Sequence, residues 1–212
     1  MRANVVNQEK ILSKAGIDDF FAGLKTIQFE ELEKDFLQYS FSDVEKYKSI
    51  VGNLEYTIVP RSSLSKNIVG EIMLKDFICE DKFTQACFLN RRKQVVCVFD
   101  RRIFYRTLEL QNELTALGYD EKGFKVVSGH RHPMYNEKIG GATGSRHLRG
   151  EAVDIRILDI NNDGSINQAD KMIVLDILER KIIGDRGGIG LYPGTMSLHY
   201  DVRGKKARWN SY

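Results

Sequence analysis

The sequence predicts an α+β fold in which helices pack on one face of a central antiparallel sheet, preceded by a mainly helical N-terminal extension. Three observations predict this fold. Residues 151–157 and 197–203 alternate polar and apolar side chains, as strands with one buried face do. The apolar run at residues 94–99 is followed by a helical pattern over residues 102–117. Residues 1–50 repeat apolar side chains at helical spacing.

The chain is expected to have two parts: an N-terminal extension of unknown role, residues 1–83, and a core domain, residues 84–212. Helical patterns cover residues 8–24 and 29–39 of the extension. Gly118 is expected to end the long core helix as a C-terminal cap. The remaining predicted elements are a strand over residues 55–59 that stops at Pro60, a strand over residues 124–127, and a helix over residues 171–182.

Composition and charge exclude some classes of protein. The 212 residues are 42% hydrophobic and carry a net charge of +3, which is typical of a globular chain and too small to indicate a nucleic-acid partner. We see no apolar run long enough to span a membrane, and no signal peptide after Met1. The protein is therefore expected either in the cytoplasm or outside it after removal of an export signal. Its oligomeric state is not predicted.

The cysteines do not indicate a thiolate metal site. The chain has three, Cys79, Cys87 and Cys97, and no C-x-x-C pair. Cys97 lies in an apolar run and is expected to be a buried small hydrophobic residue. Cys79 and Cys87 are candidates for pairing, and the odd count leaves at least one thiol free or bonded to another molecule.

One short stretch, together with a later histidine, predicts a metal site. If the apolar faces of the two alternating segments pack inward, Asp154, His199 and Asp201 point to the opposite face of the sheet. His147 precedes a turn at Gly150 and can fold back over the strand. Two imidazoles and a carboxylate suit zinc, and three protein ligands leave a position for water. This pattern predicts a zinc cleft on the face away from the helices. The alternative is a chance His-Asp spacing with a core histidine.

Three motifs then occur in a fixed order. In chain order they are the segment Ser128-Gly129-His130-Arg131-His132-Pro133-x-Tyr135-Asn136, the segment Ser145-x-His147-x-x-Gly150-x-Ala152-x-Asp154, and a C-terminal block of residues 187–193, 199–204 and 208–209. On these motifs the chain resembles the zinc D-Ala-D-Ala carboxypeptidase family of peptidoglycan peptidases over roughly residues 95–210. That family includes dipeptidases and phage endolysins, and it shares its fold with the hedgehog signalling domain.

The resemblance implies roles for particular residues. It implies His147, Asp154 and His199 as zinc ligands, and Arg131 as the group that holds substrate or stabilises the oxyanion. It implies Ser145 as a hydroxyl that supports the metal site or binds substrate. The implied reaction is hydrolysis of a peptide bond in peptidoglycan, by a D,D-carboxypeptidase or endopeptidase. Such an enzyme acts in the periplasm, at the cell envelope or after secretion, or from the cytoplasm if it is a phage-type lysin.

The chain departs from the family pattern at two places. Many relatives have an acidic general base three residues before the last histidine ligand, where this chain has Met196. Asp201 is the substitute candidate for that catalytic role, or else a partner that orients the metal site. His130 and His132 replace the usual tyrosine and serine beside the arginine, as candidate substrate contacts or proton donors, or as solvent-exposed residues. Met196 also favours the alternative function, a non-catalytic zinc- and calcium-binding module of hedgehog-like fold.

A second metal pattern lies between the zinc ligands. Residues 159–170 match an EF-hand loop, with Gly164 at the required turn, and resemble the loops of dockerin modules. The expected calcium ligands are Asp159, Asn161, Asp163, the carbonyl of Ser165, Asn167 and Asp170. We expect bound calcium to brace the zinc site. The alternatives are an Asn- and Asp-rich turn without metal and, for the whole protein, a calcium-dependent adhesion or docking function.

Overall fold

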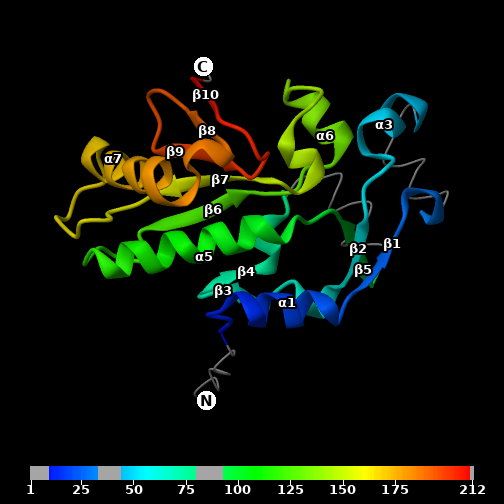
Figure 1. The fold of residues 1–212 in the computed structure, drawn as a ribbon, viewed down its shortest axis with the longest axis horizontal. Coiled ribbons are helices and arrows are strands. Elements are labelled where there is room, and N and C mark those ends of the chain that lie inside the picture. The colour runs from blue at the N-terminus through cyan, green and yellow to red at the C-terminus, as the bar shows by residue number, and fades with distance from the viewer. Residues whose placement is uncertain (1–9, 33–43, 80–92, 211–212) are drawn as a thin grey trace, which may run out of the picture.

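The computed structural model describes residues 10–32, 44–79 and 93–210, which form a mixed α+β structure (Figure 1). These residues contain five α-helices and sheets of five, three and two strands. The helices are α1 (Lys14–Ala22), α3 (Val44–Val51), α5 (Arg101–Ala116), α6 (Pro133–Lys138) and α7 (Gln168–Ile177). The predicted class of fold is therefore confirmed.

The main sheet has the strand order β10-β8-β9-β7-β6. Its strands are β6 (Phe124–Ser128), β7 (Ala152–Ile157), β8 (Gly188–Leu191), β9 (Ser197–Asp201) and β10 (Ala207–Asn210). The pairs β6–β7, β7–β9 and β8–β9 are antiparallel as expected, but β10 is parallel to β8, so the sheet is mixed and the expectation of an antiparallel sheet is wrong for β10. Because β9 already has β7 and β8 as neighbours, β10 pairs with the free edge of β8. The chain reverses after β9, which is antiparallel to β8, so β10 runs in the same direction as β8.

The described N-terminal part contains short strands in addition to the expected helices. The strands β1 (Lys25–Ile27), β2 (Tyr56–Pro60) and β5 (Gln94–Cys97) form one antiparallel sheet. The strands β3 (Asn67–Val69) and β4 (Ile72–Met73) form a second, smaller one. Since β5 lies beyond residue 84 and pairs with β2, the two predicted parts share a sheet. The boundary at residues 83/84 falls outside the described residues and stays a prediction.

Local capping explains where the first helix begins. The Ser13 side chain accepts a hydrogen bond from the Gly16 backbone N–H, which starts α1 at Lys14, later than the pattern over residues 8–24 predicts. The pattern over residues 29–39 gives only a 3₁₀ turn at Phe29–Glu31, and its remainder from residue 33 lies outside the described residues.

The helix α5 packs against the apolar face of the main sheet. Tyr200 of β9 is fully buried there, and its hydroxyl lies 2.8 Å from the hydroxyl of Thr107 on α5. The ring of Phe104, also on α5, lies 4.9 Å from Phe21 of α1 and 4.4 Å from Phe77. These aromatic contacts join the N-terminal elements to the core beneath the sheet. A buried side chain of this size contributes roughly 1.5–3 kcal/mol to folding.

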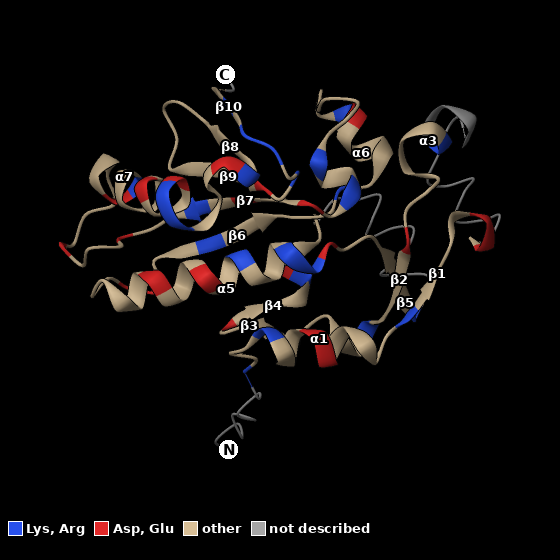
Figure 2. Cartoon of the chain, in the orientation of Figure 1, with Lys and Arg blue, Asp and Glu red and all other residues tan. Residues whose placement is uncertain are grey.

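The charged surface, the helices and the buried cysteine were each the subject of an expectation from composition. Lys and Arg are interspersed with Asp and Glu along α5 and α7 (Figure 2). None of the helices in the described part of the chain is long and apolar enough to cross a membrane. Cys97 is buried as predicted, and burial raises the pKa of its thiol. The pairing of Cys79 with Cys87 concerns a residue outside the described ranges and stays a prediction.

Gly150 provides the first test of this fold. It has φ +62° and ends the 3₁₀ turn before β7, and an added Cβ would lie 2.1 Å from the carbonyl oxygen of Val98. We expect Gly150→Ala to lower the free energy of unfolding by about 1–3 kcal/mol, measured by urea denaturation. Gly144→Ala is the matched control, since no heavy atom lies within 4 Å of its added Cβ. Equal stability of the two variants would contradict the strained turn.

Candidate metal centre

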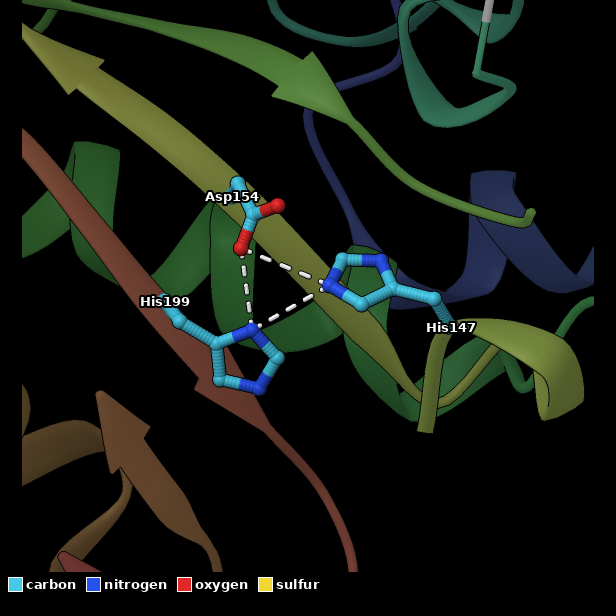
Figure 3. Close-up of side chains that lie close together, drawn as sticks. All are labelled: His147, Asp154 and His199. Atoms are coloured by element: carbon cyan, nitrogen blue, oxygen red, sulfur yellow. Dashed lines mark hydrogen bonds and ion pairs between the residues drawn. The ribbon is translucent and has the colours of Figure 1, made fainter. Parts of the chain in front are cut away.

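Two neighbouring strands and a turn bring together the three predicted zinc ligands (Figure 3). Asp154 on β7 lies directly opposite His199 on β9 in the antiparallel register. Since side chains alternate along a strand, both point away from the face that carries Tyr200 and α5. His147 comes from the 3₁₀ turn Arg146–Arg149, and the left-handed Gly150 folds this turn back over β7. The predicted convergence of these three residues is confirmed.

The ligand atoms are close and shielded from solvent. His199 Nδ1 lies 2.9 Å from Asp154 Oδ1, and His147 Nε2 lies 3.2 Å from His199 Nδ1 and 3.4 Å from Asp154 Oδ1. The exposed fractions are 2% for His147, 6% for Asp154 and 5% for His199. Among the described residues, this group brings three His, Cys, Asp or Glu ligand atoms within 4.8 Å of one another.

The outer nitrogens of the two imidazoles decide whether this group suits a cation. His147 Nδ1 lies 2.7 Å from the carbonyl oxygen of Gly129, which can only accept, so this nitrogen is the donor. His199 Nε2 lies 3.2 Å from Asp201 Oδ2 and donates to it when that carboxylate is ionised. Both neutral rings therefore point lone pairs inward, beside the carboxylate of Asp154. Two nitrogens and one oxygen with an open position suit zinc.

Burial and the neighbouring side chains together shift the pKa values of the three ligands in different directions. Burial would raise the pKa of Asp154, but the imidazoles of His147 and His199 outweigh burial and hold it well below its usual range. Burial lowers the pKa of His147. Burial acts on His199 in the same sense, but hydrogen bonds to Asp154 and Asp201 outweigh it and raise the pKa of His199. Asp154 is therefore ionised, while a proton competes with a cation at His199.

Asp201 lies behind His199 and away from the other two ligands. It is fully buried, and both of its oxygens accept hydrogen bonds from the Arg203 guanidinium, while Oδ1 also accepts the Gly188 N–H at 3.0 Å. These bonds and the charge of His199 hold the pKa of Asp201 low against the effect of burial. A carboxylate committed in this way orients the imidazole of His199. The geometry thus favours the positioning alternative, and the role of Asp201 as a substitute general base stays a prediction.

The glycines of β8 make room for this support. An added Cβ at Gly188 would lie 2.2 Å from Asp201 Oδ2, and one at Gly190 would lie 2.6 Å from the indole of Trp209. Trp209, on β10, in turn has its ring centroid 5.0 Å from that of His199. Small residues on β8 therefore allow Asp201 and Trp209 to approach His199. The glycine-rich composition hid this strand from sequence reasoning, because glycine is depleted in strands.

Arg131 lies beside the metal group, and its implied role in holding substrate or stabilising an oxyanion stays a prediction. Its guanidinium forms an ion pair with Asp154 Oδ2, and its Nε donates to the Ser128 hydroxyl at 3.0 Å. Its backbone N–H donates to the carbonyl of His147 at 3.1 Å, which links the arginine segment to the turn that carries the ligand. A guanidinium is always charged and has planar donors, so it can also bind a carboxylate or an oxyanion near the metal position.

Tyr192 is a residue of the centre that sequence reasoning missed. It follows β8 directly, and its hydroxyl donates to Asp154 Oδ1 at 3.0 Å. Burial raises the pKa of this phenol, so the hydroxyl stays protonated and acts as a donor. Asp154 is thus held on Oδ1 by Tyr192 and on Oδ2 by Arg131. The tyrosine lies inside the quoted C-terminal block, and its place between a strand and the last ligand was the available signal.

The other predicted substrate contacts, Ser145, His130 and His132, have surroundings that say less about their roles. The Ser145 hydroxyl has no hydrogen-bond partner within the described part of the chain. His132 is buried, and its Nδ1 accepts from the Met134 N–H at 3.3 Å, so the imidazole caps α6. Its role as a substrate contact stays a prediction. His130 is half-buried. Burial lowers the pKa of its imidazole, and the nearby imidazoles of His132 and His147 lower it further. A neutral His130 suits a polar contact better than a cationic one.

Met196, at the usual position of the general base, packs against the hydrophobic core. Its backbone carbonyl accepts a hydrogen bond from the Ile157 N–H at 2.8 Å. This position therefore contributes apolar packing in this chain, and its side chain cannot transfer a proton.

The predicted calcium loop is formed as a turn, but its carboxylates bind the backbone of the loop itself. Asp159 accepts from the N–H groups of Asp163 and Gly164, and Gly164 has φ +85° as the pattern requires. Asp170 is fully buried and accepts from the N–H groups of Ile160, Asn161 and Asn167. The structure therefore supports the turn and does not test the cation.

Comparison with known proteins agrees with the geometry of the site. The profile of the Peptidase M15 family matches residues 76–180, close to half of the chain, and includes Arg131, His147 and Asp154. No match was found among curated proteins or among solved structures. The chain belongs to the peptidase M15 family, the family of zinc D-Ala-D-Ala carboxypeptidases, and has the candidate zinc site of a metallopeptidase of that family. His199 lies beyond the matched residues, and the β7–β9 pairing completes the site.

The raised pKa of His199 makes metal binding sensitive to pH. A proton on His199 occupies a lone pair that a cation needs, while Asp154 stays ionised because its pKa is lowered. We expect the apparent zinc affinity to fall as the pH is lowered from about 8 to about 5, measured by competition with a chromophoric chelator. Asp201→Asn removes a charge that raises this pKa, so its fall is expected at lower pH. A pH-independent affinity in the unchanged protein would contradict the ligand assignment.

Proposed function

We propose that the protein hydrolyses a peptide bond in the peptide part of bacterial peptidoglycan, as a D,D-carboxypeptidase or an endopeptidase. Membership of a peptidase family implies a peptide substrate. The observation that carries the proposal is the convergence of His147, Asp154 and His199 beneath the guanidinium of Arg131. Such a substrate would place the protein in the periplasm, at the cell envelope or outside the cell, or in a host cytoplasm if it is a phage-type lysin.

The residues of the site divide the work of this reaction. His147, Asp154 and His199 would hold zinc, which supplies an acidified water and polarises a carbonyl when bound. The carbonyl of Gly129 and the carboxylate of Asp201 fix the two imidazoles in the tautomers that bind a cation.

Charge stabilisation falls to Arg131. Its guanidinium is already beside the metal position, where a fixed positive charge stabilises an oxyanion or holds a substrate carboxylate. Because the side chain is mostly buried, with 14% exposure, this charge acts in a medium less polar than water and its effect is stronger. Since Met196 is apolar and Asp201 faces the far side of His199, we assign neither to proton transfer.

The peptidase proposal is tested by digestion of purified muropeptides followed by mass spectrometry. We expect loss of a terminal D-Ala from a carboxypeptidase, or cleavage of a cross-link from an endopeptidase. His147→Ala is expected to lose at least about 10³-fold in rate, because it removes a metal ligand. Arg180→Ala is the matched control, since Arg180 lies on the surface with 77% side-chain exposure.

A particular result would favour the alternative function, a non-catalytic zinc- and calcium-binding module. The apolar Met196 at the usual base position is the observation that supports this alternative. Zinc retained at one equivalent with no cleavage of any muropeptide, and with His147→Ala like the unchanged protein in every assay, would overturn the peptidase proposal.

We also propose that the loop of residues 159–170 binds calcium. The complete spacing of oxygen-bearing residues and the left-handed Gly164 support this proposal. At calcium about a hundredfold above its Kd, the melting temperature is expected to rise by about 5–10 °C, measured by calorimetry with and without a chelator. Asp163→Ala should remove this rise, whereas Asp185→Ala, an exposed carboxylate outside the loop, should keep it. A melting temperature and an activity unchanged by calcium removal would end the proposal.

A further inference from the structure

The first turn of α7 contains a lysine that is almost completely buried. Lys171 is 4% exposed, and its ammonium donates to the backbone carbonyls of Tyr192 at 3.0 Å and Thr195 at 2.7 Å. Within the described part of the chain, both of its partners are these carbonyl oxygens and no carboxylate pairs with it. Lysine is rarely buried without a charged partner, because removing an ammonium from water is costly. This position therefore calls for an explanation other than stability.

Both carbonyls belong to the turn that joins β8 to β9. The Tyr192 carbonyl also accepts the Thr195 N–H at 3.2 Å and the Thr195 hydroxyl at 2.9 Å. Gly194 adopts φ +73° at the tip of this turn, and the Ser197 N–H donates to the Thr195 hydroxyl at 3.1 Å as β9 begins. The ammonium of Lys171 thus holds both ends of a tight turn from the side of α7.

The same turn holds a donor to the metal group. The Tyr192 hydroxyl donates to Asp154 Oδ1, the oxygen that lies 2.9 Å from His199 Nδ1. Loss of a partner that holds a ligating carboxylate in place commonly weakens metal binding by about tenfold to a hundredfold. Any movement of the turn would therefore change the orientation of Asp154 and the start of the strand that carries His199.

We propose that Lys171 is a positioning residue of the metal centre, which holds the β8–β9 turn so that Tyr192 binds and orients Asp154. The effect passes from the ammonium to the Tyr192 carbonyl, from the Tyr192 hydroxyl to Asp154, and from Asp154 to the metal. The proposal deepens the function proposed above, because it concerns the same site. It requires a metal at that site and does not require a particular substrate.

The stability of Lys171→Met separates this role from a purely structural one. Methionine keeps an apolar stem of similar length, so the packing of the lysine methylenes is retained while the buried charge is removed. The Tyr192 carbonyl keeps its two bonds from Thr195. The melting temperature is therefore expected to change by less than about 4 °C, which corresponds to about 1 kcal/mol in a domain of this size.

The experiment measures zinc affinity by chelator competition and the visible absorption spectrum of the cobalt-substituted protein. Lys171→Met and Tyr192→Phe are each expected to weaken zinc binding by about tenfold to a hundredfold and to change the cobalt spectrum in the same way. Because both residues act along one path, the double variant is expected to lose no more than Tyr192→Phe alone. Lys181→Met is the matched control, since Lys181 forms an exposed ion pair with Glu113.

Either of two results would overturn the proposal: zinc affinity and cobalt spectrum of Lys171→Met equal to those of the unchanged protein, or losses that multiply in the double variant. If Lys171→Met does not fold, Lys171→Gln retains a donor on a shorter chain and is expected to give a smaller loss of the same kind. No loss in that variant would also overturn it. Since neither readout uses a substrate, absence of muropeptide cleavage would overturn the proposed substrate alone.

Discussion

The metal centre depends on the cross-strand pairing of Asp154 with His199. The antiparallel register of β7 and β9 places the carboxylate and the imidazole opposite each other, and the alternation of side chains turns both away from the core. A shift of either strand by one residue would move the ligand on that strand to the apolar face that packs against α5, and the two ligands would no longer share a face. Fully buried residues of the same two strands, such as Ile155, Leu198 and Tyr200, make such a shift costly. The core therefore fixes the geometry of the site.

Burial of charged and polar groups is the cost of this arrangement, and the surrounding donors and acceptors offset it. The two imidazoles donate outward to the Gly129 carbonyl and to Asp201, while Asp154 accepts from Arg131 and Tyr192. Buried polar groups are tolerated when all are hydrogen-bonded. The remaining inward lone pairs and the single carboxylate suit a divalent cation. This is why the same residues that look unfavourable for folding are consistent with membership of a metallopeptidase family.

The parts of this structure that the sequence predicts are those encoded over short distances. Strict alternation predicted β7 and β9, and the ordered motifs predicted the ligands and Arg131. The strand β8 escaped prediction, because its glycines serve the approach of Asp201 and Trp209 rather than strand propensity. The roles of Asp201, Tyr192 and Lys171 depend on contacts between elements far apart in the chain. Side-chain pattern alone does not contain those contacts.

The most direct test of the metal centre is X-ray absorption at the zinc K edge of the purified, zinc-loaded protein. The geometry predicts a shell of two imidazole nitrogens and one carboxylate oxygen at about 2.0–2.2 Å, completed by a water oxygen. The multiple-scattering signature of two imidazoles should be present, and that of one should be lost in His147→Ala. A sulfur at about 2.3 Å, or a shell of oxygens without imidazole scattering, would contradict the assignment of His147, Asp154 and His199 as the zinc ligands.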